Sequence, residues 1–169
     1  MGTRAALMLA IALSCPAVWG AAEETTNPRT AARSEVKVFL IALEDNGRRG
    51  EKVGCGDSVV PVAAELDTTS GPLTAALTHL LSPGLRDPGG PDGQQLYNAL
   101  SGSELSVRRV EVKNGMATIE LTGRFQIGGV CDAPRVEAQL RKTALQFPGV
   151  TGTVIRINGT PLERLLQGR

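Results

Sequence analysis

A serine in the run Gly56-Asp57-Ser58-Val59 is the best candidate in this chain for a catalytic nucleophile. A serine hydroxyl becomes nucleophilic when a general base, normally a histidine oriented by an aspartate, lies within hydrogen-bond reach. His79 is the single histidine of the chain. It lies opposite the apolar positions of an expected helix, so we expect it to point to solvent and not toward Ser58.

The same four residues resemble the nucleophile block of GDSL-type hydrolases. The resemblance ends there, because the late Asp-x-x-His pair of that family is absent from the sequence. We therefore expect Ser58 to belong to an ordinary turn, and we expect neither catalytic residues nor a cofactor. A hydrolase that uses Ser58 is the most distant of the functions considered.

Metal ligands are scarce as well. With one histidine and no carboxylates clustered at helical spacing, the chain cannot assemble a zinc site by itself. The loop Leu85–Gly93 is rich in glycine and proline, and its Asp87 and Asp92 could bind a calcium ion only weakly.

Four arginines could gather on one sheet face and bind an anionic glycan or a partner's carboxylates. Ordinary exposed strand positions would explain them too. They are Arg108, Arg109, Arg124 and Arg156.

Residues 1–22 have the features of a secretory signal peptide. Arg4 precedes an apolar run from Ala5 to Leu13, and small residues follow at Gly20-Ala21-Ala22. The apolar run is too short to span a hydrocarbon core of ~30 Å. An alternative is lipid attachment at Cys15, because the residues before it resemble a bacterial lipobox. With either processing we expect an exported protein, periplasmic or extracellular, that contacts a membrane only if Cys15 is lipidated.

This location determines how the other two cysteines are interpreted. In an oxidising compartment Cys55 and Cys131 most simply form a disulfide. Closing a loop of about 77 residues would stabilise the fold by about 4.5 kcal/mol in the chain-entropy account. Two free buried thiols and a metal site are the alternatives, and the metal site lacks further ligands.

The composition indicates one small domain after the leader. The 169 residues include 18 Lys and Arg and 17 Asp and Glu, which gives a net charge of +1. The concentrated basic surface that nucleic-acid binding requires is therefore missing, and we expect no nucleic-acid partner. We expect residues 23–34 to form a flexible polar linker and residues 35–169 to form the domain.

The strongest local signal is a β-hairpin. Asn114-Gly115 lies between alternating apolar residues and fits a type I′ turn, whose two central residues need positive φ. With Lys113 opposite Met116, two apolar pairs fall on one face: Val112 with Ala117, and Val110 with Ile119. The apolar phase slips at Arg108 and Arg109, which indicates a β-bulge.

Three more strands and a charged loop are expected around this hairpin. Pro61 cannot donate a hydrogen bond to a ladder, so the strand that contains it should be an edge strand. The charged loop is expected over Asp45–Lys52. The strands are expected at Val36–Leu43, Val59–Val62 and Gly152–Ile157.

Two amphipathic helices are predicted by apolar residues at helical spacing. The first should begin with a cap and an early proline in Thr69-Ser70-Gly71-Pro72 and be stopped by Pro83-Gly84. The second should be capped by Asp132, carry Arg135 on its solvent face, and be ended by Pro148-Gly149. A short helix over Gln94–Leu100 and a terminal turn over Leu162–Leu166 are also expected. The predicted fold class is α+β, a small mixed sheet with two helices packed on one face.

Several of these segments, in their order and spacing, resemble the GerMN domain, the sporulation and spore germination domain. They are the hairpin Val110–Ile119, the run Leu145-Gln146-Phe147-Pro148-Gly149-Val150, and the run Val154-Ile155-Arg156-Ile157-Asn158-Gly159. The resemblance extends over roughly Val36 to Pro161. It implies a secreted or lipid-anchored envelope module, akin to the ring-building motifs of sporulation complexes, that acts through protein contacts and has no accepted catalytic residues.

The paired cysteines depart from the sporulation members and favour a general envelope protein. We therefore expect a noncatalytic extracytoplasmic module that binds an envelope protein. The alternative is a domain that binds cell-wall material such as peptidoglycan, through the arginine-bearing face and the Leu85–Gly93 loop.

Overall fold

The hairpin organises one of two sheets in the computed structural model, which describes residues 2, 32–83, 85 and 95–167. Strand β4 (Glu104–Lys113) turns through Asn114-Gly115 into β5 (Met116–Arg124), and both turn residues have positive φ, 49° and 80°. The pairing of Lys113 with Met116 is confirmed. So is the bulge, because the register shifts between Val107 and Arg109.

The far side of β5 pairs with a later part of the chain. Strand β6 (Gly152–Ile157) lies parallel to β5, and the two-residue β7 (Thr160–Pro161) pairs antiparallel with β6. The sheet order is β4-β5-β6-β7, with helix α3 (Leu162–Gln167) after it. Strand β6 was predicted from the sequence, whereas β7 was not.

The second sheet is antiparallel and has the order β1-β3-β2. It consists of β1 (Arg33–Ala42), the short β2 (Glu51–Lys52) and β3 (Ser58–Asp67), with the 3₁₀ turn η1 (Gly54–Gly56) between the last two. Strand β1 begins at Arg33, inside the range expected to be linker. Strand β2 pairs only with Ser58 and Val59, so from Val60 onward β3 is the edge strand that Pro61 predicted.

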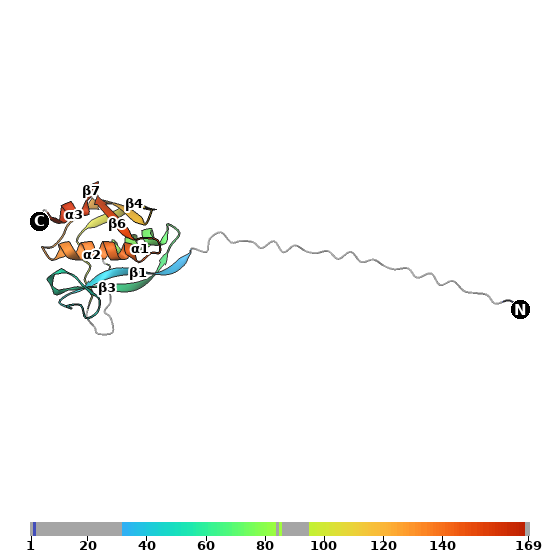
Figure 1. Ribbon diagram of the computed structural model, residues 1–169, viewed down its shortest axis with the longest axis horizontal. Helices are drawn as coiled ribbons and strands as arrows, with labels where there is room; N and C mark the ends of the chain where they lie inside the picture. Colours follow the sequence, from blue (N-terminus) through green and yellow to red (C-terminus); the bar gives the residue numbers. More distant parts are fainter. Residues whose placement is uncertain (1, 3–31, 84, 86–94, 168–169) are drawn as a thin grey trace. The chain divides into compact units, whose positions relative to one another are not determined.

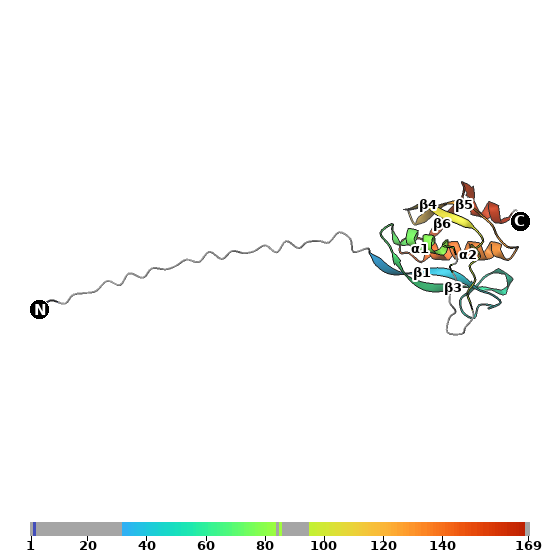
Figure 2. The ribbon, with the colours of Figure 1, turned by 180° about the vertical axis from the view of Figure 1, so that it is seen from behind.

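Helices α1 (Pro72–Leu80) and α2 (Asp132–Leu145) lie between the two sheets (Figures 1 and 2). Helix α1 contacts β1, β3 and β4, while α2 contacts β1, β3 and β6. Leu77 and Leu140 are completely buried in the aliphatic core that results. The α+β class is confirmed, but the expectation of one sheet with helices on one face was wrong. Both helices bury apolar residues against a sheet on either side.

Three local expectations were also wrong. Gly71, with φ 95°, occupies the position before α1, and no side chain caps that helix. Cys131 precedes α2, and Asp132 uses its carboxylate for contacts other than a cap. The helix expected over Gln94–Leu100 does not form in its described part, because Tyr97 pairs with Ile41 of β1 as an isolated antiparallel bridge; Gln94 lies outside the described residues.

The outer edge of β1 is completed by side chains of α2 and of Gln146, the residue that follows it. The Gln146 side chain accepts a hydrogen bond from the Lys37 N–H at 2.9 Å and donates one to the Lys37 carbonyl at 2.6 Å. The next outward residue, Phe39, donates its N–H to the Thr143 hydroxyl and receives the Gln139 amide on its carbonyl. A polar row on α2 therefore takes the place of a neighbouring strand.

We expect Gln139→Leu to lower the free energy of unfolding by about 2–5 kcal/mol, because buried backbone groups would lose their partners. Gln139 is fully buried and also accepts the Ala99 N–H at 2.9 Å. Gln146→Leu is the matched control and should cost much less, since water can replace its exposed contacts. Urea unfolding of both variants measures the difference, and equal losses would contradict this account of the β1 edge.

Candidate functional site

Ser58 begins β3 and is completely buried. Its hydroxyl donates to the Asp45 carboxylate at 2.6 Å and accepts the Gly47 N–H at 2.7 Å. Asp45, itself 1% exposed, also accepts the Arg49 N–H at 2.7 Å. The candidate nucleophile therefore fastens the charged loop Asp45–Lys52 to the start of β3.

His79 lies elsewhere, on α1. Its side chain lines a surface hollow together with Asp67 and Ser70, and Ser58 is not part of that hollow. Burial lowers the pKa of His79 below its ordinary value. In the part of the chain that the structure describes, no hydrogen bond joins His79 to Ser58. The geometry that a serine hydrolase needs is not formed by these two residues.

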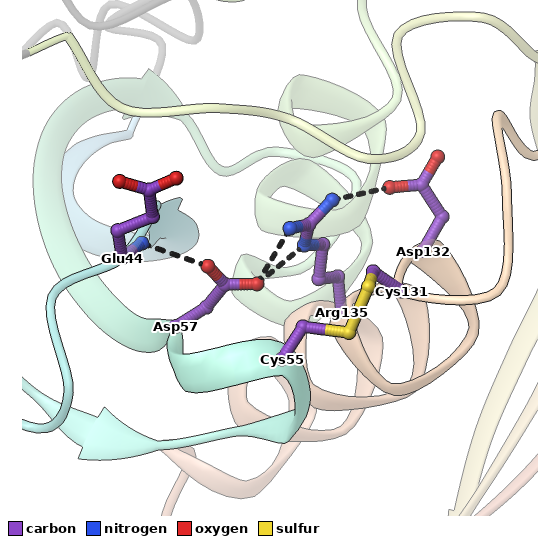
Figure 3. Close-up of a disulfide and its surroundings, with 6 residues drawn as sticks. All are labelled: Glu44, Cys55, Asp57, Cys131, Asp132 and Arg135. Atoms are coloured by element: carbon purple, nitrogen blue, oxygen red, sulfur yellow. Dashed lines mark hydrogen bonds and ion pairs between the residues drawn. A yellow bond between two sulfur atoms is a disulfide. The ribbon is translucent and has the colours of Figure 1, made fainter.

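A disulfide connects the turn that follows the charged loop Asp45–Lys52 to the start of α2 (Figure 3). The structure brings together Cys55 of η1 and Cys131, immediately before α2, with 5.8 Å between their Cα atoms. Cys55 has a φ of 62°, in the left-handed region that few non-glycine residues adopt. The bond fixes the end of the charged loop against the start of α2.

A buried ion-pair network lies beside the disulfide (Figure 3). Asp57, which is fully buried, receives the Nε and Nη2 atoms of Arg135, each at 2.7 Å. Nη1 of the same guanidinium donates to Asp132 at 3.0 Å. The Glu44 N–H donates to the other oxygen of Asp57 at 2.9 Å. Arg135, expected on the solvent face of α2, is instead partly buried, with 17% of its side chain exposed, and connects α2 to Asp57, just before β3.

Tyr97 and a glycine loop complete the network. The Tyr97 hydroxyl donates to Asp132 at 3.2 Å, and the Gly128 N–H donates to the same oxygen at 2.7 Å. The Arg135 guanidinium lies over the Tyr97 ring at 5.4 Å from its centroid. Burial, followed by the charge of Asp132 and the hydrogen bond to it, raises the pKa of Tyr97, so the phenol remains a donor.

Asp57 was considered in the sequence only as part of the serine run, and the roles of Asp132 and Arg135 in this network were missed. A usable signal existed, since Asp57 follows Cys55 by two positions and Asp132 follows Cys131 by one. If the cysteines pair, two carboxylates come close together and require a cation. Arg135, one helical turn after Asp132, is in reach.

The arginines of the β4-β5-β6 sheet lie largely on its outer face, away from α1 and α2. Glu120 of β5 is opposite Arg109 on one side and Arg156 on the other. Three of the four arginines pair with carboxylates: Arg108 with Glu120 at 3.8 Å, Arg109 with Glu111 at 3.1 Å, and Arg124 with Glu104 at 2.7 Å. Arg156 donates to the Gly159 carbonyl at 3.4 Å. Lys113 shares Glu111 with Arg109, so the face carries five cations and three carboxylates, and most of its cations lie beside a carboxylate.

Other residues singled out in the sequence lie outside the described residues, namely Cys15, Asp87 and Asp92. Within the described ranges, no three His, Cys, Asp or Glu side chains gather as a metal site would require. Nor does any described helix have the length and apolar character needed to cross a bilayer.

We expect Arg135→Met to lower the free energy of unfolding by about 3–5 kcal/mol, because it leaves two buried carboxylates without their cation. The matched control is Arg124→Met, whose ion pair with Glu104 is exposed and should contribute little. Urea unfolding at pH 7 compares the two. A loss at Arg135 no larger than the loss at Arg124 would show that the network does not stabilise the fold.

The Ser58 contact should be visible in the titration of Asp45. The Ser58 hydroxyl, and then the Arg49 N–H, lower the pKa of Asp45 against the opposing effect of burial. We expect Ser58→Ala to raise that pKa toward its ordinary value, as measured by NMR titration of the carboxyl. Ser70→Ala, on the exposed turn before α1, is the control and should leave the pKa unchanged.

The same titration has a consequence for stability. Because the folded-state pKa lies below the unfolded-state value of about 4, the contact stabilises the protein above that pH and is lost as pH falls through the folded value. The difference in unfolding free energy between the native chain and Ser58→Ala should therefore be largest near neutral pH and shrink in acid. A difference that grows in acid would contradict the assignment.

Comparison with known proteins agrees with this fold. A family model described as "Sporulation and spore germination" (Germane) matches residues 42–163. The tandem GerMN domains of the sporulation protein GerM from Bacillus subtilis are similar in structure, with a TM-score of 0.51 and 17% identity over 81% of this chain and 43% of that one. The first GerMN domain of GerM alone gives a TM-score of 0.54 and 18% identity over 77% of this chain and 86% of that one.

This chain spans less than half of the tandem-domain structure, and identities this low establish the fold alone. No functionally curated protein sequence matches the chain. The family model, however, covers well over half of the residues. The chain therefore belongs to the sporulation and spore germination family, which is related to the GerMN domains.

Proposed function

We propose that this chain is a noncatalytic module of the cell envelope that binds a protein partner outside the cytoplasm. The observation that carries the proposal is the outer face of the β4-β5-β6 sheet, which no other element of the described residues covers. Helices α1 and α2 pack on the opposite face of this sheet. On the outer face, charged side chains lie next to the exposed side chains of Met116 (43%) and Val154 (36%). Arginine, methionine and a partly apolar centre are common in protein interfaces.

The polar residues nearest to a reactive arrangement support a noncatalytic role. Ser58, Asp57 and Asp132 are buried, and each is engaged in contacts that connect loops to strands and helices. A reactive group needs access to a substrate as well as a base. These side chains are suited to stabilising the fold.

Export is supported by the leader-like residues 1–22 and by the disulfide, since such bonds persist in oxidising compartments. The family description adds a role in sporulation and germination at the level of the family. For this chain we propose the broader role of an envelope module, anchored by lipid if Cys15 is acylated.

The ion pairs on the outer face favour a protein partner over cell-wall polymer. An anionic polymer is best held by arginines without nearby carboxylates, whereas Arg108, Arg109 and Arg124 each have one. A protein surface can match alternating charges and gain specificity from their pattern.

A photo-crosslinking residue at Thr118, in the middle of the outer face, tests the proposal in cells that produce the protein. We expect a discrete protein adduct that survives digestion of the wall by muramidase. The same probe at Ser70, on the exposed turn before α1, should give none. Arg156→Glu should reduce the adduct, while Arg33→Glu, on the other sheet, should not.

The opposite outcome is equally definite. Loss of the Thr118 adduct on muramidase digestion, together with salt-sensitive sedimentation of the purified chain with sacculi, would assign the face to cell-wall binding and reject a protein partner.

A further inference from the structure

The edges of the β1-β3-β2 sheet are treated differently by the fold. On β1, the backbone groups of Lys37 and Phe39 that face away from β3 are bonded by Gln146, Thr143 and Gln139. On β3, strand β2 covers Ser58 and Val59 and then stops. The edge from Val60 to Leu66 carries no neighbouring strand within the described part of the chain.

The register specifies which groups this edge presents. Phe39 directs its N–H and carbonyl away from β3, so its partner Pro61 must direct its own groups away from β1. The same alternation applies to Ala63 and Glu65. The open edge therefore presents the carbonyl of Pro61 and both backbone groups of Ala63 and Glu65, and the missing N–H of Pro61 costs the β1 ladder nothing.

Side chains beside this edge add chemical preferences. Glu65 lies directly opposite Glu35 of β1, both are exposed, and neither forms an ion pair within the described residues. Like charges placed opposite each other are unfavourable, and a nearby cation would relieve them. Further along the same face, Phe39, Pro61 and the exposed Leu145 line a hollow of about 330 Å³.

The edge of the other sheet is less suited to pairing. Strand β4 bulges at Arg108 and carries several charges along its length, two features that discourage strand addition. Between Val60 and Leu66 the β3 edge is straight and carries only Pro61 and the single charge of Glu65. Pro61 leaves intact the outward backbone groups of Ala63 and Glu65.

We propose that the edge of β3 from Val60 to Leu66 binds an extended segment of a partner protein as an additional antiparallel strand. The segment carries a basic side chain opposite Glu65 and, four positions further along its own chain, an apolar side chain opposite Pro61. Backbone hydrogen bonds give such binding its affinity, and alternate side chains give its specificity. This inference rests on the proposed function, binding of a protein partner, and adds a second contact site, on the other sheet, with the chemistry of the segment that it takes.

The test is a ¹H–¹⁵N NMR titration of the full chain with a capped peptide of sequence Thr-Lys-Thr-Val-Thr-Leu-Thr. We expect shifts centred on the amides of Ala63 and Glu65. A peptide with Glu in place of Lys should bind about two- to fivefold more weakly, the range of an exposed ion pair. In Glu65→Lys this preference should reverse, whereas the matched variant Glu111→Lys, on the other sheet, should retain it.

Ala63→Pro removes one outward N–H without touching the β1 ladder, and it should abolish binding. If that variant fails to fold, the charge reversal at Glu65 still decides. Absence of shifts at millimolar peptide, or shifts confined to β5, would overturn the inference. Pairing of two β3 edges from separate copies, detected as self-association that competes with the peptide, would also overturn it.

The two proposals fail separately. A protein adduct from the Thr118 probe, combined with no peptide binding at β3, would retain the proposed function and reject this site. Peptide binding at β3 without an adduct from Thr118 would retain this site and move the docking surface away from the outer face of β5.

Discussion

A guanidinium held between two buried carboxylates is the interaction that sets the geometry of this domain. Arg135 comes from the first turn of α2, Asp57 immediately precedes β3, and both are largely shielded from water. Removing such charges from water is costly, and the cost is offset only when each oxygen and each N–H finds a partner. Here the Glu44 and Gly128 backbone groups supply the missing donors. The helix can therefore meet the sheet in one orientation.

The same helix is bound to the sheet by two different surfaces. Its apolar stripe, which includes Val136 and Leu140, packs into the core, while its polar row of Gln139 and Thr143 completes the β1 edge. Exposed strand edges invite pairing with other chains. The polar row closes one edge, and the domain is left with distinct closed and open sides.

Local features of the fold could be predicted from the sequence, and features that depend on distant partners could not. The Asn114-Gly115 turn and the bulge near Arg108 follow from conformational preference and alternation within a few residues. The existence of two sheets depends on which strands pair with each other, and the apolar–polar alternation within a strand does not specify its partner. The polar row of α2 was missed because Gln139 and Thr143 are usually assigned to solvent.

In the candidate site, too, single residues could be picked out from the sequence, but their contacts with distant partners could not. Asp57 and Ser58 drew attention as parts of a possible reactive run, yet the structure uses them to hold loops in place. The arginines were expected to share a face, and Arg109 and Arg156 do lie on either side of Glu120. The ion pairs of Arg108 with Glu120 and of Arg124 with Glu104 could not be foreseen, because they depend on the register set by the bulge.

That bulge makes the first half of β4 sensitive to chain length. Leu105 and Val107 face the core before it, Val110 does so after it, and the extra residue at Arg108 reconciles the two phases. Deleting one residue there would rotate every earlier side chain of the strand to the opposite face and bring Glu104 and Ser106 inward. Substitutions at Arg108 leave the alternation intact, so this position of the chain should tolerate a change of residue type far better than a change of chain length.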